Sequence, residues 1–332
     1  MTLPPRLAPA LALTAAFAAH VEPAGAQPGR ALDVVASFSV LSDMASRVGG
    51  ERVSVTTLVG PGEDAHVFEP SPADAARVAE ADVVIVNGLG FEGFIDRLIE
   101  ASGTEARIVT ATEGIDPLEA GGHHGEHADG HDDDHGEAAA AAGGRGHGDH
   151  GDHDHGPNDP HAWHAVPNAR AYVATIADGL CAADPDGCET YRANASAYTG
   201  ELDALEAELA ATLGAIPADR RTMIVSHDAF GYLAHAHGLA FLAPQGVSTE
   251  SEASAADVAR LIDQIRTDRA AAVFVENIAD PRLIERIAEE TDITIGGTLY
   301  SDALSPAGGP AATYVEMMRH NAATIVGAVS GS

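Results

Sequence analysis

Histidine is the residue type through which this chain could do most of its chemistry. The 332 residues include 17 histidines, and nine of them lie between positions 122 and 156. These nine are His123, His124, His127, His131, His135, His147, His150, His153 and His155. Imidazole nitrogens bind divalent transition metals. Residues 119–157 also carry many carboxylates and almost no large apolar side chain, so we expect a mobile loop that binds several ions weakly.

This histidine-rich segment has two other interpretations. A tandem zinc finger is excluded, because no C-x-x-C pair accompanies the histidines and no apolar residues could pack around the metal. A stretch that only keeps the chain soluble remains open, although acidic residues alone would achieve that. We therefore expect the segment to be an accessory that gathers or senses metal beside a more rigid site.

Four other side chains are placed where a rigid metal site could form. His66 and Asp302 each follow a predicted strand, His227 ends one, and His161 lies where the histidine-rich segment rejoins the folded chain. Ligands of open α/β sheets bind beyond the carboxyl ends of the strands. Three imidazoles and one carboxylate form a four-coordinate shell that suits Zn²⁺. Taken singly, each histidine would more often be an ordinary polar residue at a helix cap or on the surface of a lobe.

The elements that must position these side chains alternate between strand and helix patterns in both halves of the chain. Apolar, β-branched runs predict strands at 31–39, 53–60, 82–90, 107–112, 221–229, 239–246, 271–277 and 293–301. Amphipathic patterns predict helices at 40–50, 71–81, 91–102, 254–268, 280–291 and 310–329, with Ser71 and Ser254 as N-caps. Such alternation predicts parallel sheets covered by helices.

A long helical stretch without internal proline, 189–216, lies between the two halves and would measure about 40 Å. We therefore predict an α/β fold of two lobes, each a mainly parallel sheet flanked by helices, joined by one long linking helix. The predicted boundaries are a signal peptide at 1–26, an N-terminal lobe at 27–187 with the mobile loop 119–157, the linking helix at 188–216 and a C-terminal lobe at 217–332.

The expected compartment is the periplasm. Arg6, a short apolar run at 7–19 and an A-G-A cleavage site at 24–26 are typical of a secretory signal peptide. No cysteine follows the cleavage site to carry a lipid, and no later run has the length of a membrane helix. In this oxidising compartment we expect Cys181 and Cys188 to form a disulfide. The alternative, a thiolate metal site, lacks further ligands near the pair.

The charge of the chain excludes several classes of protein. The formal net charge is −32, and all 18 basic residues are arginines. Nucleic acid is not an expected partner, because phosphate binding needs clustered positive charge. The absence of lysine from the sequence excludes Schiff-base enzymes and lysine-dependent phosphate loops.

Four segments carry a resemblance to a known family. They are HVFEP at 66–70, DPHAW at 159–163, ENIADPRLIERIAEET at 276–291 and YSDALS at 300–305. Together they resemble the zinc and manganese solute-binding proteins of ABC transporters (the cluster A-I, or cluster 9, family). The similarity covers essentially the whole mature chain. It implies the two-lobed fold and the metal ligands His66, His161, His227 and Asp302.

The third ligand position separates the branches of that family. Manganese members resemble this pattern but usually place a glutamate there, whereas zinc members place a histidine, as His227 does here. Zinc members also tend to carry a histidine-rich acidic loop. Imidazole suits Zn²⁺, while Mn²⁺ prefers more oxygen donors. The resemblance thus implies the zinc branch.

The implied function is high-affinity periplasmic binding of Zn²⁺ as transported cargo and its delivery to an ABC importer. The expected partners are the inner-membrane permease and a periplasmic zinc chaperone, and the expected state is a monomer. Alternatives are a manganese- or iron-binding member of the same family, or a zinc-storage or chaperone protein not coupled to transport. An enzyme is not expected, because Asp302 fills the position that a catalytic zinc keeps open for water.

The remaining candidate residues have simpler interpretations. Glu276, at a strand end, is expected to be solvated or to contact a ligand from outside the shell. His164 is close to the site but is not expected to bind the ion, and Trp163 is expected to pack beside it. A helix end before Gly238 explains two further histidines, His235 and His237. An exposed position on the last helix is expected for His320.

Overall fold

The computed structural model describes residues 30–121 and 158–331. The predicted signal peptide and residues 122–157 of the histidine-rich segment lie outside the described residues. Among the helices that are described, none combines the length and hydropathy needed to cross a membrane.

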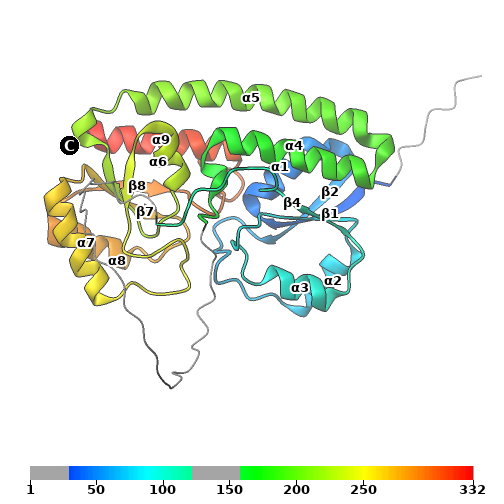
Figure 1. Cartoon of the computed structure of the whole chain (residues 1–332), viewed down its shortest axis with the longest axis horizontal. Coiled ribbons are helices and arrows are strands. Elements are labelled where there is room, and N and C mark those ends of the chain that lie inside the picture. Colours follow the sequence, from blue (N-terminus) through cyan, green and yellow to red (C-terminus); the bar gives the residue numbers. More distant parts are fainter. Residues whose placement is uncertain (1–29, 122–157, 332) are drawn as a thin grey trace, which may run out of the picture. The chain divides into compact units, whose positions relative to one another are not determined.

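Two four-stranded sheets with the same strand order form the framework. The first has the order β2-β1-β3-β4 and the second β6-β5-β7-β8, and every adjacent pair is parallel. The strands are β1 Leu32–Phe38, β2 Val53–Val59, β3 Val83–Val86, β4 Arg107–Thr110, β5 Thr222–Ile224, β6 Ala240–Leu242, β7 Ala272–Glu276 and β8 Ile295–Leu299. The predicted α/β fold with two parallel-sheet lobes is confirmed (Figure 1).

Helices flank both sheets. They are α1 Ser39–Gly49, α2 Pro72–Glu80, α3 Ile95–Ser102 and α4 Val166–Ala183 around the first sheet, and α6 Gly231–His237, α7 Ala255–Asp268, α8 Arg282–Thr291 and α9 Tyr314–Gly331 around the second. The predicted N-caps Ser71 and Ser254 are confirmed. In each, the serine side chain accepts a hydrogen bond from the third helical N–H, and the aspartate there accepts one from the serine backbone.

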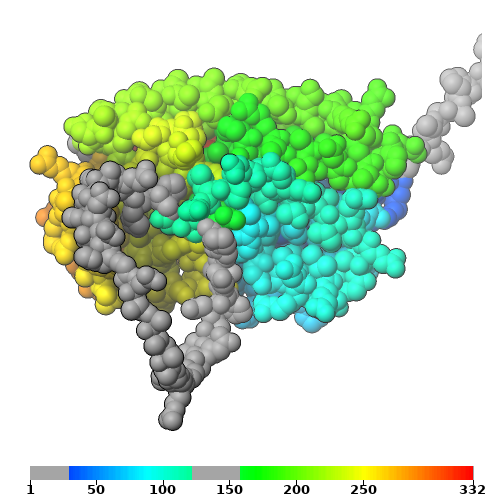
Figure 2. All heavy atoms as spheres, viewed as in Figure 1, coloured from blue at the N-terminus to red at the C-terminus, as the bar shows by residue number. Residues whose placement is uncertain are grey.

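A long helix, α5 Cys188–Gly214, links the lobes. It packs against α1 and α4 of the first lobe and against α6 and α9 of the second lobe. Leu202, Leu205, Leu209 and Leu213 form its buried stripe at helical spacing. The outward side of α5, yellow-green in Figure 2, faces solvent along its length.

Helix α4 was not predicted from the sequence. Its buried residues recur at helical spacing on one face, but alanines such as Ala174 and Ala182 also occupy its exposed face, so the two faces differ little in hydropathy. An amphipathic pattern was therefore weak, although the proline in its first turn is a common helix-start signal.

The strands around the site are shorter than predicted. The run 221–229, expected as a strand that leads into a loop, forms a strand over Thr222–Ile224, and Val225 is also fully buried. Apolar composition reports burial, and here the residues after Ile224 keep only single contacts to the neighbouring chain, from the Val225 N–H to the Leu242 carbonyl and between His227 and Gln245. The pattern alone could not separate these two states.

The predicted disulfide between Cys181 and Cys188 is present, and it joins the end of α4 to the start of α5. We expect the double variant Cys181→Ser/Cys188→Ser to lose about 2 kcal/mol of unfolding free energy, because the bond constrains the unfolded chain. Urea denaturation of both forms measures this. Metal affinity should not change, because the disulfide lies at the C-terminal end of α4, whereas His161 precedes its N-terminal end. A weakened metal affinity would show that the disulfide does affect the metal site.

Candidate metal centre

The four predicted side chains meet at the carboxyl ends of the two sheets. His66 follows β2, His227 follows β5 and Asp302 follows β8, while His161 immediately precedes the 3₁₀ helix Ala162–His164 that leads into α4. One potential ligand atom from each lies within 4.8 Å of the others. All four residues are buried, with at most 3% of the surface exposed.

The distances within the group suit a single small cation. Asp302 Oδ2 lies 3.2 Å from His66 Nε2 and 3.2 Å from His227 Nε2, and Asp302 Oδ1 lies 3.6 Å from His161 Nε2. A tetrahedral zinc ion with bonds of about 2.0–2.1 Å places its ligand atoms about 3.3–3.4 Å apart. The four side chains therefore need little movement to share one ion.

Several polar atoms of this group have no hydrogen-bond partner among the described residues. They include Nε2 of His161 and of His227 and both carboxylate oxygens of Asp302. Buried polar atoms are nearly always satisfied by protein, water or an ion. A divalent cation held by these atoms would satisfy all of them together.

Asp159 orients His161. Its Oδ1 accepts hydrogen bonds from the His161 Nδ1, 2.7 Å away, and from the His161 backbone N–H, 2.9 Å away. With Nδ1 occupied as a donor, Nε2 is left with the lone pair that binds a metal. Asp159 is itself held by Tyr232, whose hydroxyl donates to the Asp159 carbonyl at 2.9 Å. The same hydroxyl accepts from the Leu118 N–H at 3.0 Å.

Glu276 orients His227 in the same way. Its Oε2 lies 2.7 Å from His227 Nδ1, and its Oε1 accepts from the backbone N–H groups of Ser226 at 2.7 Å and His227 at 2.9 Å. Of the two expectations for Glu276, the solvated one is wrong, because the side chain is buried at the end of β7 beneath the His227 loop. The contact to a ligand from outside the shell is what the structure shows.

The loop that carries His66 is fixed by contacts to the opposite sheet. Gly62 turns the chain with φ 75°, and its N–H donates to the Leu304 carbonyl at 3.0 Å. Leu304 in turn donates its N–H to the Ser39 hydroxyl at 2.9 Å. The ligands His66 and Asp302 are thus held by segments that bond to each other.

The charges of the group favour a cation. Burial lowers the pKa of His66. Burial also opposes the charge of His227, but the Glu276 and Asp302 carboxylates outweigh it and raise the pKa of His227 well above its usual value. Against the effect of burial, His227 and His161 hold the pKa of Asp302 well below its usual range. Asp302 is therefore an anion ready to bind a metal, while a proton competes for His227.

Aromatic rings pack against the ligand histidines. Trp163 is fully buried, donates from Nε1 to the Ser301 carbonyl at 3.0 Å and packs against Phe38, Phe91 and the His161 ring. This agrees with the expected packing role. His164 points away into the rings of Trp163 and Phe230, and burial lowers its pKa to about 4.

The remaining histidines lie away from the group. His235 and His237 occupy the last turn of α6 before Gly238, which adopts φ 66°, as expected. The expectation of an exposed His320 is wrong. Its Nε2 lies 3.0 Å from the Thr298 carbonyl and its ring contacts Tyr300, because α9 packs directly on β8.

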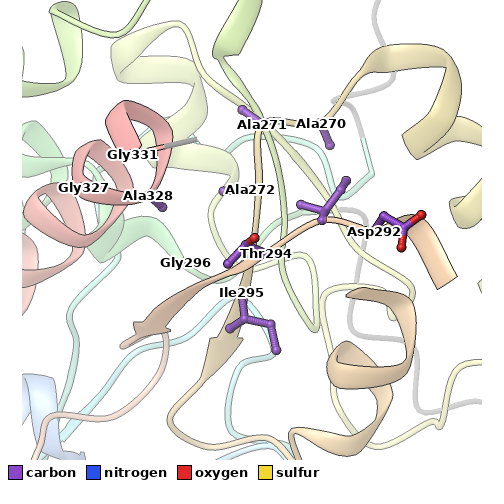
Figure 3. Close-up of a pocket in the computed structure, with 11 residues that line it drawn as sticks. Ala270, Ala271, Ala272, Asp292, Thr294, Ile295, Gly296, Gly327, Ala328 and Gly331 are labelled. Carbon is purple, nitrogen blue, oxygen red and sulfur yellow. The ribbon is translucent and has the colours of Figure 1, made fainter. Parts of the chain in front are cut away.

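A separate pocket of about 460 Å³ lies at the opposite, amino-terminal ends of β7 and β8. Figure 3 shows that alanines at the start of β7, residues 294–296 at the start of β8 and the end of α9 line it. Asp292 is its one titratable lining residue. One carboxylate among small apolar side chains does not form a metal site, so the chemistry lies at the carboxyl ends of the strands.

Comparison with known proteins gives the family of this chain. Residues 34–328 match the family model described as ZnuA, zinc-uptake complex component A, periplasmic. The chain belongs to this family. The family consists of solute-binding proteins and not of enzymes, which agrees with a site whose four side chains surround one ion position.

Relatives and solved structures cover nearly the whole chain. The manganese-binding lipoprotein MntA of Halalkalibacterium halodurans is 33% identical over 96% of each chain. The iron-binding protein YfeA of Yersinia pestis is 29% identical over 88% of this chain and 84% of its own. The periplasmic zinc-binding protein TroA from Treponema pallidum is 27% identical, with a TM-score of 0.76 over 90% of this chain and 99% of that chain. Family members therefore differ in the metals for which they are named.

Removing the orienting carboxylate beside His161 should weaken metal binding. We expect Asp159→Asn to lower affinity about 10- to 100-fold, because the imidazole loses the acceptor that fixes its orientation and raises its basicity. Competition with a chromogenic chelator measures this, with Asp186→Asn as a control that changes an exposed carboxylate after the far end of α4. An unchanged affinity would contradict the assigned role of Asp159.

Metal affinity should depend on pH through His227. Because the Glu276 and Asp302 carboxylates raise its pKa well above the usual value, a proton competes with the metal for the imidazole and must leave when a metal binds. Affinity should therefore rise with pH until His227 loses its proton, which occurs above the range in which an ordinary imidazole titrates. Glu276→Gln should move this dependence to lower pH, since the variant loses the carboxylate that favours the protonated ring.

Chelator competition between pH 5.5 and pH 8 measures both curves. Glu285→Gln, an exposed position on α8, is the matched control and should follow the native curve. If the Glu276→Gln curve coincided with the native curve, His227 would not be the group whose proton the metal displaces.

Proposed function

We propose that this protein captures Zn²⁺ in the periplasm and delivers it to the permease of an ABC importer. The observation that carries the proposal is the donor set, three imidazoles and one carboxylate, at separations that suit tetrahedral coordination. His227 supplies nitrogen at the position where oxygen would favour Mn²⁺. The description of the family, a periplasmic component of zinc uptake, supports the same metal and compartment.

A manganese- or iron-binding function is the second candidate. It is supported by the names of MntA and YfeA, relatives that are named for manganese and iron. The two oxygens of Asp302 face different histidines, so a larger ion could take the carboxylate through both. This would add a fifth donor and an additional oxygen, which Mn²⁺ prefers.

We propose that the histidine-rich segment gathers zinc for the cleft. Its two flanks lie beside each other, because Glu119 pairs with Asn158 and the Asp159 N–H donates to the Leu118 carbonyl at 2.8 Å. The chain leads from this paired base through Asp159 to His161. An ion released at the base is therefore within a few residues of a ligand of the site.

The metal that the cleft selects is tested by metal content. The mature protein, with and without residues 122–157, is stripped by a chelator, exposed to equal Zn²⁺ and Mn²⁺, desalted and analysed by mass spectrometry. We expect one tightly held zinc per chain in the shortened form. His227→Ala should abolish it, whereas His235→Ala, on the exposed side of α6, should leave it unchanged.

The outcomes separate the candidates. Bound manganese in the shortened form would contradict the zinc function and support the second candidate, a manganese-binding function. No bound metal in the shortened form, with several ions in the complete one, would move the binding function from the cleft to the histidine-rich segment.

A further inference from the structure

The loops that follow the two corresponding edge strands, β2 and β6, are joined by one hydrogen bond. Thr249, in the segment between β6 and α7, donates from Oγ1 to Asp64 Oδ2 at 2.6 Å. Asp64 lies in the loop after β2, two residues before the ligand His66. The bond therefore connects the two lobes directly beside the metal centre.

The other oxygen of the same carboxylate fixes the ligand loop. Asp64 Oδ1 accepts a hydrogen bond from the His66 backbone N–H at 2.9 Å. One side chain thus bonds to the backbone of a ligand in its own lobe and to a hydroxyl of the opposite lobe. A displacement of Thr249 therefore acts on the His66 backbone through the Asp64 carboxylate alone.

The segment that carries Thr249 is in turn attached to another ligand. Gln245 forms a parallel bridge with His227, and the Asp228 N–H donates to the Gly246 carbonyl at 3.0 Å. The connection therefore runs from His66 through Asp64 and Thr249 to the backbone of His227. These hydrogen bonds link the loops of His66 and His227, which are far apart in the sequence.

Asp64 and Thr249 both line an open pocket of about 500 Å³. Val67 and Ser226, each adjacent in sequence to a ligand histidine, line it too, and Val67 is 52% exposed. The ligand side chains of His66 and His227 are themselves fully buried. An ion can leave on this side only if the loops that separate the pocket from the ligands move apart. The Asp64–Thr249 bond joins these two loops.

We infer that Asp64 is a positioning residue for His66 and that its bond to Thr249 is a latch that slows release of the bound metal. The inference rests on the proposed function, in which the four-residue cleft holds the cargo ion. With the latch formed, both loops are held against the ligands. With the latch broken, the loop after β6 separates from the His66 loop and the ion is released faster.

The test measures metal dissociation from the mature, full-length protein. Zinc-loaded protein is mixed with excess chelator in a stopped-flow instrument, and the slow release phase from the cleft is followed. Thr249→Val keeps the shape of the side chain and removes the donor, so release should accelerate about tenfold, the range expected for a bond to a charged acceptor. Thr249→Ser retains the hydroxyl and should release zinc within about twofold of the native rate.

A double-variant cycle separates the latch from independent effects. Asp64→Ala should accelerate release at least as much as Thr249→Val, and the combined variant should release no faster than Asp64→Ala alone. Glu289→Gln, an exposed carboxylate on α8 that does not line the pocket, is the control and should match the native rate.

The failures can be told apart. Equal release rates for native protein and Thr249→Val, or multiplicative effects in the combined variant, would overturn the latch and leave the proposed function intact. A native protein with no slow phase for either zinc or manganese would overturn the proposed function, and the latch with it. If the slow phase occurs only with manganese, the same cycle is measured with that ion and decides the latch in the same way.

Discussion

A fully buried carboxylate in contact with three imidazoles is the constraint on which the rest of this structure depends. Asp302 is taken out of water, and its two oxygens face His66, His161 and His227. Such a charge is tolerated only when it is neutralised and its lone pairs are used. A cation at the centre of the four side chains does both. The site is therefore most stable when it holds the ion that the protein is proposed to carry.

The protein fixes these ligands through a second set of acceptors. Asp159 and Glu276 each place one oxygen against the Nδ1 of a ligand histidine and another bond on nearby backbone. Tyr232 then ties Asp159 to the segment before the histidine-rich stretch. Because each layer is bonded to the next, the geometry of the ligands is set by the packed lobes and not by the flexibility of single loops.

The family of the chain and its metal are decided by different features. Coverage of residues 34–328 by one family model places the chain among metal-binding solute-binding proteins. Relatives of similar length are named for manganese, iron or zinc, so the shared fold does not select the ion. Selection depends on the donor atoms and on how freely they can move. His227 and the close spacing of the four side chains favour zinc, while the two oxygens of Asp302, which face different histidines, would allow a larger ion.

The sequence alone determined the two-lobed α/β fold, because strand and helix patterns alternate and local signals such as Ser71 and Ser254 mark helix starts. It also singled out four ligand candidates, since parallel strands bring their carboxyl ends to one edge of a sheet. It did not reveal α4, because alanines on the exposed face of this helix reduce the contrast between its two faces, or the partial burial of His320 against β8. The contacts of Asp159, Glu276, Tyr232 and the Asp64–Thr249 pair were decided only by the tertiary structure. These contacts join residues whose separation in sequence carries no signal, and hydrogen bonds depend on distances that exist only once both sheets are packed on α5.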